Sequence, residues 1–392
     1  MKKFSNYLLI VLAILSLSLY GCGDKRGTEL PPPSYQPPTG GDSGVNPGDD
    51  PGDDPGGDED PDGTGIIDPH PGSWDANRGK VVTPSGTGWT SKVIAEGITY
   101  YTYTSTQDAT TGVCEQVFAI DLDLNNPNYQ VKLTYNSASP YTSDVFSSNN
   151  AIVAMNAGYE RGSIFIRSKG SIHSNLPNVT IGDTGVPNWK SEGAFVCDGS
   201  QAIKLLYIGS SKRNALVKDI AGGTVADAVR KQRSYCTSLS VAKFPYVLTS
   251  APMLVYDYEP VGENFADYSL TSAQVNKLNS EDPDRHQRVR HPRTAVALTE
   301  NNHFIMFVVD GRYDSYSKGM SCRELTRFMV KHFNPQFALN LDGGGSSTLC
   351  VQGEGDANTH VVNYPCDNAT NGVPHDHSGQ RARDTHIIIV RK

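Results

Sequence analysis

A glycine-rich segment near the C-terminus places several chemically useful residues next to one another. In FALNLDGGGSSTL (337–349), an apolar run ends at Asp342 and is followed by three glycines and two serines. Glycine loses more backbone entropy on ordering than any other residue, so three in succession indicate close approach of the backbone to a ligand. Their N–H groups suit an anion, Ser346 and Ser347 can donate hydrogen bonds, and Asp342 can serve as an acid or base. The alternative is a tight structural turn whose hydroxyls cap the following element.

Three well-known glycine motifs do not fit this segment. A Walker A loop requires a lysine after its last glycine, and none follows here. The dinucleotide-binding pattern GxGxxG and the nucleophile pattern GxSxG both require glycine where the chain has Thr348. Nucleotide loops and a serine nucleophile of the α/β-hydrolase type are therefore excluded, and a general anion-binding loop remains.

A second aspartate lies at the end of another apolar run. The run HFIMFVVD (303–310) ends at Asp310, and Arg312 follows two residues later. Between the two runs, SCRELTRFMVKHF (321–333) predicts a helix, because its Ser and Glu are spaced for a capping box and its apolar residues share one face. If the two strands are parallel neighbours, Asp310 and Asp342 lie at the same sheet edge, where open α/β sheets bind ligands.

Most of the remaining chain is rich in β-strand patterns. Aromatic, β-branched and alternating apolar residues predict strands over 97–106, 115–124, 294–300 and 385–392. Helical patterns are fewer, and two more occur at 224–232 and 270–279. We therefore expect an α+β fold: a single β-rich domain with a mixed sheet, a few helices and an active site at strand carboxyl ends.

The first 86 residues have the composition of a targeting segment followed by a tether. Lys2 and Lys3 precede a short apolar run, and LYGC, ending at Cys22, resembles a bacterial lipoprotein signal, in which that cysteine carries the lipid. Residues 1–21 are thus expected to be the signal peptide; an ordinary signal peptide and a retained membrane anchor are the alternatives. Residues 22–86 are rich in Pro, Gly and Asp, which predicts a disordered tether because such a segment buries no core.

Charge and cysteine content limit the functional classes. The chain has 34 basic and 42 acidic residues, but the acidic excess lies in residues 23–72, and residues 73–392 carry 30 of each sign. A balanced folded part excludes a general nucleic-acid binder. We expect an exported, lipid-anchored protein in the periplasm or at the cell surface of the outer membrane. Disulfides, with Cys350–Cys366 closest in sequence, and buried free thiols are both compatible with export.

Several segments resemble the phosphodiester glycosidase family, beginning with NLDGGGSSTL (340–349), which resembles its signature. The others, in the family's order, are AMNAGY (154–159), APMLVYD (251–257), HPRTAVAL (291–298), VVDGR (308–312), SKGMSCRELTRFM (317–329) and QRARDTHIIIV (380–390). Residues 87–392 are therefore expected to form the phosphodiester glycosidase domain. The chain departs from the family pattern at Glu160, where Phe is usual, and at Ser250 and Ala251, where two glycines are usual.

The resemblance implies hydrolysis of a sugar-1-phosphodiester bond, such as an α-N-acetylglucosaminyl phosphodiester, with release of free sugar from a glycan or glycoconjugate. It implies Asp310 and Asp342 as the catalytic pair, since glycosidases usually use two carboxyl groups. Arginines and backbone N–H groups suit the single negative charge of a phosphodiester. The implied substrate or phosphate contacts are Asn156, Arg293, Arg312, Gly343, Gly344, Gly345, Ser346, Ser347 and Arg381.

Other roles and functions stay open at this level. The sequence requires no cofactor, and a need for metal is undecided: His375 and His377 could chelate one, although a solvent-facing loop is the simpler interpretation. Glu324 is a reserve acid whose capping role already explains it. The expected partners are the phosphodiester-linked glycan and the membrane, reached through the lipid on Cys22, but not nucleic acid. The alternatives are a non-catalytic carbohydrate-binding surface lipoprotein and a phosphodiesterase that leaves the sugar phosphorylated.

Overall fold

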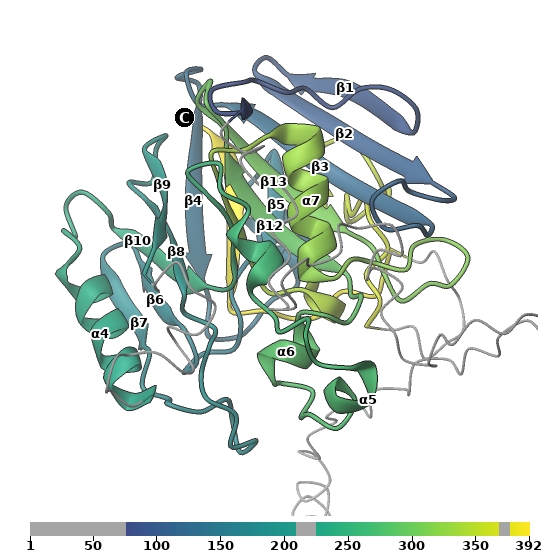
Figure 1. Ribbon diagram of the computed structural model, residues 1–392. Coiled ribbons are helices and arrows are strands. Elements are labelled where there is room, and N and C mark those ends of the chain that lie inside the picture. The colour runs from purple at the N-terminus through teal and green to yellow at the C-terminus, as the bar shows by residue number, and fades with distance from the viewer. Residues whose placement is uncertain (1–75, 209–224, 368–376) are drawn as a thin grey trace, which may run out of the picture. The chain divides into compact units, whose positions relative to one another are not determined.

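The computed structural model describes residues 76–208, 225–367 and 377–392 (Figure 1). All of them belong to one compact unit, Gly48–Lys392. The predictions for the signal peptide, Cys22, most of the tether and His375 lie outside the described residues. Within the described ranges, no helix is long and apolar enough to cross a membrane.

Three β-sheets form the framework of this unit. The seven-stranded sheet has the order β1 (Trp89–Ala95), β2 (Ile98–Ser105), β3 (Glu115–Asp123), β13 (His303–Val309), β12 (Arg293–Leu298), β14 (Phe337–Asn340) and β11 (Met253–Tyr256). The five-stranded sheet has the order β7 (Ser171–Asn175), β6 (Phe165–Ser168), β10 (Tyr246–Ser250), β8 (Gly193–Cys197) and β9 (Ile203–Tyr207). The four-stranded sheet has the order β15 (Leu349–Val351), β5 (Val153–Asn156), β16 (Thr385–Arg391) and β4 (Tyr129–Tyr135).

Helices are fewer and mostly short. They are α3 (Thr142–Ser148), α4 (Val225–Ser238), α5 (Ser272–Val275), α6 (Pro283–His286) and α7 (Cys322–Phe333), with 3₁₀ turns η1 (Val261–Asn264) and η2 (Gly344–Ser346). This composition confirms the predicted α+β class and the β-rich domain. The described cysteines that follow Cys22, including Cys350 and Cys366, are all free thiols.

Strand β13 lies at the centre of the core because both of its faces are buried. Phe304, Met306 and Val308 point into the main hydrophobic core, which the other two sheets share. Ile305 and Phe307 point into a second core on the opposite face. This two-residue alternation is why β13 appears in the sequence as an uninterrupted apolar run.

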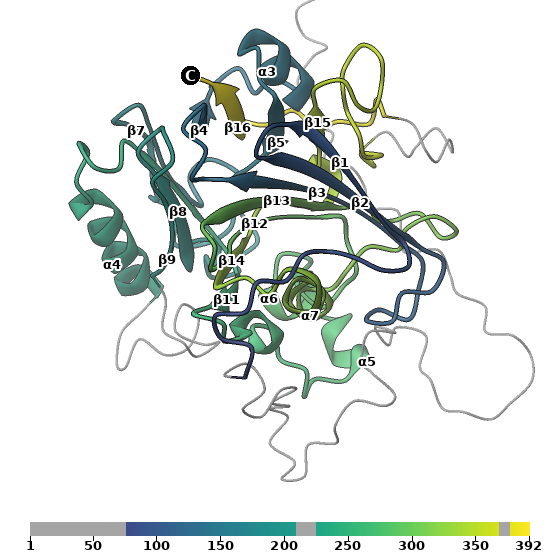
Figure 2. The same ribbon diagram turned by 90° about the horizontal axis from the view of Figure 1, so that it is seen from above.

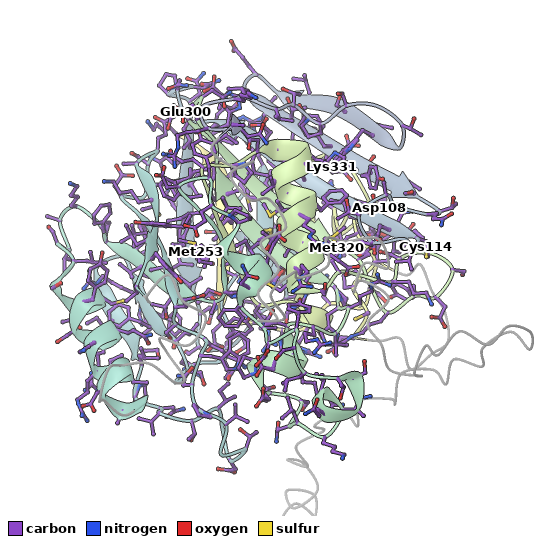
Figure 3. The ribbon with its side chains drawn as sticks, viewed as in Figure 1. Asp108, Cys114, Met253, Glu300, Met320 and Lys331 are labelled. Atoms are coloured by element: carbon purple, nitrogen blue, oxygen red, sulfur yellow. The ribbon has the colours of Figure 1, made fainter. Side chains whose placement is uncertain are left out.

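Helix α7 covers the second face of the seven-stranded sheet. Figure 2 shows α7 end-on beside β12, β13 and β14, and Phe328 and Met329 belong to the core on this face. The predicted capping box is present: Ser321 Oγ accepts from Glu324 N (3.3 Å), and Glu324 Oε2 accepts from Ser321 N (2.8 Å). In Figure 3, Met320 lies near the N-terminal end of α7 and Lys331 near its C-terminal end.

The strand order differs from the predicted parallel neighbours in one respect. Strands β13 and β14 run in the same direction, but β12 lies between them and pairs antiparallel with both. The strand pairs that the structure describes are all antiparallel, so the sheets are not mixed. The chain passes from β13 through α7 to β14, which is two positions away in the sheet. No local pattern in the sequence predicts that β12 lies between them. Both strands still end at the same sheet edge, one on each side of the start of β12.

Candidate active site

Asp310 follows β13 directly and is almost completely buried, with 1% of its surface exposed. Its Oδ1 accepts from Asn363 Nδ2 (2.9 Å), and its Oδ2 accepts from Tyr364 N (2.9 Å) and from the Tyr316 hydroxyl (3.4 Å). Burial raises the pKa of Asp310 to about 7, and these three hydrogen bonds oppose that rise. Asp310 therefore changes its protonation state near neutral pH, as a proton-transfer group must.

Asp342 lies on the other side of β12 in a different electrostatic environment. Arg383 Nε is 2.7 Å from Asp342 Oδ2, and the same Nε–H donates to Ser346 Oγ (2.6 Å). The contact with Asp342 is therefore a charge pair rather than a hydrogen bond. Within the described chain, the buried Oδ2 of Asp342 accepts no hydrogen bond. Such an oxygen is available to a water or a substrate group.

The glycines after Asp342 form the turn η2 and leave two backbone donors unused. Gly344 has a left-handed backbone (φ +62°), and its N–H donates to Pro292 O (2.8 Å). The N–H groups of Gly343 and Gly345 donate to no group of the described residues. Two free amides in a glycine turn are the donor arrangement that binds anions.

The third glycine lies directly beneath two charged side chains. A Cβ at Gly345 would lie 2.5 Å from Asp367 Oδ1 and 2.6 Å from Arg381 Nη2. Arg381 and Asp367 form an ion pair here, partly exposed to solvent. The predicted contact residue Arg381 is thus at the glycine turn, but its charge is balanced by Asp367.

Arg312 lies over the glycine turn and forms no ion pair with any described residue. A Cβ at Gly344 would lie 3.2 Å from Arg312 Nη2, which shows how close the guanidinium is. His291 Nδ1 accepts from Arg312 at 3.2 Å, and burial, together with Arg312 and Arg293, keeps the pKa of His291 well below its usual value. The backbone of Arg312 is left-handed (φ +68°), which costs about 1 kcal/mol for a non-glycine residue. The guanidinium is exposed and free to meet an anion.

Arg293 and Asn156 lie beside the site, and their polar atoms are used by the protein. Arg293 donates to Met320 O (2.7 Å) and Val289 O (2.8 Å), and it also contacts His286 O and Gln287 Oε1. Asn156 Nδ2 donates to Asp342 O (2.7 Å), and its Oδ1 accepts from Thr348 N (3.0 Å). In this structure both residues position the loops around the site.

The two serines of the turn are completely buried. Ser346 Oγ accepts from Arg383, and Ser347 Oγ is 3.1 Å from Thr294 Oγ1. The predicted hydroxyl donors therefore hold the turn in place, one against Arg383 and the other against β12.

Sequence reasoning missed two residues that hold the aspartates. Arg383 is two positions from Arg381 in QRARD, so the same segment signalled it, but the spacing alone does not say which arginine meets Asp342. Asn363 Nδ2 donates to both Asp310 Oδ1 and Ser347 O (2.9 Å each), joining Asp310 to the glycine turn. No local motif marks Asn363.

Residues considered for other chemistry have structural partners. Glu324 accepts from Arg290 as well as from the capping box. His377 Nδ1 donates to Asn363 O (2.7 Å). Among the described residues, no group of three or more His, Cys, Asp or Glu side chains is arranged to hold a metal ion.

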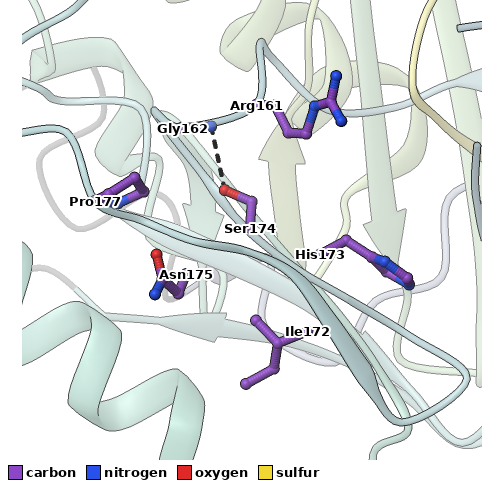
Figure 4. Close-up of a pocket in the computed structure, with 7 residues that line it drawn as sticks. All are labelled: Arg161, Gly162, Ile172, His173, Ser174, Asn175 and Pro177. Carbon is purple, nitrogen blue, oxygen red and sulfur yellow. Dashed lines mark hydrogen bonds between the residues drawn. The ribbon is translucent and has the colours of Figure 1, made fainter. Parts of the chain in front are cut away.

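A cavity of about 390 Å³ lies elsewhere, beside strand β7 (Figure 4). It is lined by Arg161, Gly162, Ile172, His173, Ser174, Asn175 and Pro177. The hydroxyl of Ser174 accepts from Gly162 N (3.1 Å) and donates to Ile164 O (2.6 Å). The cavity includes neither aspartate nor the glycine turn, so we assign the candidate active site to the sheet edge.

Comparisons with known proteins identify the family and the fold. Residues 149–389 match the phosphodiester glycosidase family. A putative exported protein from Burkholderia pseudomallei is 11% identical, with a TM-score of 0.50 over 79% of this chain and 99% of that chain. The catalytic domain of zebrafish N-acetylglucosamine-1-phosphodiester alpha-N-acetylglucosaminidase, auto-inhibited by its pro-peptide, is 17% identical, with a TM-score of 0.45 over 80% and 87% of the two chains.

A hypothetical protein from Synechocystis is 14% identical, with a TM-score of 0.45 over 79% of this chain and 64% of that chain. A search of curated proteins found no match. At 11% identity, the structure from Burkholderia pseudomallei is informative for the fold alone, and we infer nothing from the two structures with TM-scores of 0.45. The family match, in contrast, spans more than half of the chain and includes both aspartates and the glycine turn. This protein therefore belongs to the phosphodiester glycosidase family.

Proposed function

We propose that this protein hydrolyses the bond between the anomeric carbon of a sugar and a phosphodiester, releasing the free sugar from a glycan or glycoconjugate. The observation that carries this proposal is the buried Oδ2 of Asp342, which accepts no hydrogen bond within the described chain although it lies beside a glycine turn with two free amides. A buried carboxylate oxygen without a donor is costly unless a ligand or water meets it.

The phosphate belongs at the glycine turn. A phosphodiester carries one negative charge. It suits the N–H groups of Gly343 and Gly345, which have no acceptor among the described residues, and the guanidinium of Arg312, which has no carboxylate partner among them. Arg381 and Arg383 are already paired with Asp367 and Asp342. Among the described residues, Arg312 is thus the one arginine at this turn without a carboxylate partner, and its single charge matches that of a diester.

The two aspartates have different surroundings and are assigned different roles: Asp342 lies beside Arg383, and Asp310 is held by neutral donors. As the bond from the anomeric carbon to the phosphate oxygen breaks, its electron pair stays with the phosphate, and Asp342 stabilises the positive charge on the sugar. A water oxygen bonds to the anomeric carbon, and its proton passes to Asp310, whose pKa of about 7 suits proton transfer near neutral pH. The leaving group is a phosphate monoester, whose oxygen is a much weaker base than an alkoxide, so it needs little help from an acid.

Product analysis tests this reaction against its alternatives. The full chain is incubated with the p-nitrophenyl diester of α-N-acetylglucosamine 1-phosphate, and products are identified by mass spectrometry. We expect free N-acetylglucosamine and p-nitrophenyl phosphate. Release of p-nitrophenol with sugar 1-phosphate would instead identify a phosphodiesterase, and binding without any product would identify a non-catalytic binding protein.

Variants locate the activity at the proposed site. Asp342→Asn should abolish sugar release, because a neutral amide does not stabilise the cationic sugar. Asp183→Asn, in an exposed loop away from the site, is the matched control and should keep wild-type activity. Full activity in Asp342→Asn would refute the assignment of this aspartate.

We also propose that the protein is exported and anchored to a membrane through a lipid on Cys22, as its N-terminal pattern predicts. Metabolic labelling with an alkyne palmitate analogue should label the wild-type chain and not Cys22→Ser. Labelling that persists in Cys22→Ser would refute lipidation at this cysteine.

A further inference from the structure

We propose that three aromatic side chains, Tyr316, Tyr364 and His377, form the wall of the active site against which the sugar ring lies. We call these three residues the aromatic wall. The inference rests on the proposed function, because it assigns the sugar side of the same site.

The three rings pack against one another in one cluster. The Tyr316 and Tyr364 ring centroids are 5.2 Å apart and the rings are perpendicular. The Tyr364 and His377 centroids are 4.3 Å apart, with an angle of 24° between the planes. Residues 316 and 364 belong to different loops, so this cluster is assembled by the tertiary structure.

The aromatic wall is attached to the catalytic carboxyl through hydrogen bonds. The Tyr316 hydroxyl and the Tyr364 N–H both donate to Asp310 Oδ2, at 3.4 and 2.9 Å. His377 Nδ1 donates to Asn363 O (2.7 Å), and Asn363 Nδ2 donates to Asp310 Oδ1 (2.9 Å). A ligand that rests on the wall is therefore held at a set position relative to Asp310.

These three rings are more exposed to solvent than the tyrosines of the core. Tyr129 and Tyr159 are 5% and 4% exposed, as expected for core packing, whereas all three members of the aromatic wall are partly exposed. They lie next to Asp310, which is itself 1% exposed. Partly exposed rings beside a buried carboxyl are placed to meet a ligand rather than to fill the core.

The chemistry of the wall suits a neutral sugar ring. An aromatic face offers apolar area for the C–H face of a pyranose, and the tyrosine hydroxyls and imidazole offer polar edges for its hydroxyls. The anion donors of the site, in contrast, are on the glycine turn and Arg312. The phosphodiester and the sugar are thus recognised by different residues.

The experiment compares a ligand that has a sugar with one that lacks it. The KM for the p-nitrophenyl diester of α-N-acetylglucosamine 1-phosphate is measured together with the inhibition constant of methyl p-nitrophenyl phosphate. Tyr364→Ala and Tyr316→Phe are compared with the wild type, and Tyr235→Ala, an exposed tyrosine on α4, is the matched control. Tyr364→Leu keeps apolar bulk without a ring, and a thermal melt of each variant verifies folding.

We expect Tyr364→Ala and Tyr364→Leu to raise the KM of the sugar diester about tenfold and to leave inhibition by methyl p-nitrophenyl phosphate within about twofold. Unchanged KM values in the folded variants, or an equal loss for both ligands, would overturn the inference while the proposed function stands.

If the wild type releases no sugar, the proposed function fails and calorimetric titration with α-N-acetylglucosamine 1-phosphate decides the inference. Weaker binding by Tyr364→Leu than by the wild type supports the aromatic wall. Equal binding, or no binding by either, overturns it.

Discussion

The buried carboxyl of Asp310 predicts a measurable dependence of stability on pH. Its pKa in the folded protein is about 7, whereas an aspartate in an unfolded chain titrates near about 3.9. Between these values the folded protein keeps a proton that the unfolded chain has released. The free energy of unfolding therefore falls as pH rises from about 4 to about 7, and the contribution of Asp310 is present below this window and lost above it.

The size of the effect follows from the difference between the two pKa values. About three pKa units, at roughly 1.4 kcal/mol each, correspond to a loss on the order of 4 kcal/mol across the window. Asp310 is 1% exposed, so solvent screening reduces this value little. Asp310→Asn is neutral at every pH and should lack this slope.

Urea unfolding of the wild type and Asp310→Asn at pH 4.5 to 7.5 measures the effect, because the difference between the two curves isolates one residue. We expect the wild type to lose about 1.4 kcal/mol per pH unit relative to the variant. Glu192→Gln is an informative control: burial also raises the pKa of Glu192 to about 7, but this carboxyl binds Met253 N and the Tyr207 hydroxyl outside the site.

Glu192→Gln should therefore change the stability slope and leave the pH dependence of kcat/KM unchanged. Asp310→Asn should change both. A difference between wild type and Asp310→Asn that does not vary with pH would refute the argument from burial.

Three further substitutions test the parts of the site. Gly345→Ala should raise KM about tenfold, because its Cβ would lie 2.5 Å from Asp367 Oδ1 and 2.6 Å from Arg381 Nη2 and would displace this ion pair from the anion turn. Arg383→Lys should lower kcat by roughly a hundredfold with little change in KM, because lysine cannot pair with Asp342 and also hold the turn with a planar guanidinium. Arg293→Lys should lower the free energy of unfolding by about 3 kcal/mol, measured with urea, since buried carbonyls lose their donors.

Arg230→Lys, on the exposed side of α4, is the matched control for both arginine variants and should change neither activity nor stability. A wild-type KM in Gly345→Ala would show that the turn tolerates a side chain. Wild-type kcat in Arg383→Lys would remove this arginine from the mechanism. Wild-type stability in Arg293→Lys would mean that the hydrogen bonds of Arg293 make no net contribution to the free energy of unfolding.

Local patterns in the sequence were sufficient for the elements that carry the aspartates. The apolar run before Asp310 is β13, buried on both faces, and Ser321 and Glu324 form the predicted capping box of α7. The prediction that both aspartates lie at one edge assumed neighbouring parallel strands; the shared edge is present, although β12 lies between the two strands. The local patterns succeed because alternation and capping depend on residues close together in the chain.

The side chains that hold the two aspartates could not be predicted from local sequence patterns. Asp310 is held by Asn363, which is 53 residues away, and the turn after Asp342 is held by Arg383, 37 residues from Ser346. Arg293, expected at the phosphate, instead donates to buried carbonyls, because the segment from α6 to β12 folds around it. Such contacts depend on the order of the strands in the sheet and on the course of the loops. Neither can be predicted from local composition or residue spacing.

By itself, the sequence determined which segments are buried strands, where α7 begins, and that two aspartates and a glycine turn follow apolar runs. The tertiary structure decided that β12 separates the two strands, that burial raises the pKa of Asp310, and that Arg312 alone among the arginines at the glycine turn has no carboxylate partner among the described residues. The physical reason is that pKa values and free donors depend on everything packed around a group, and most of those neighbours are distant in the chain.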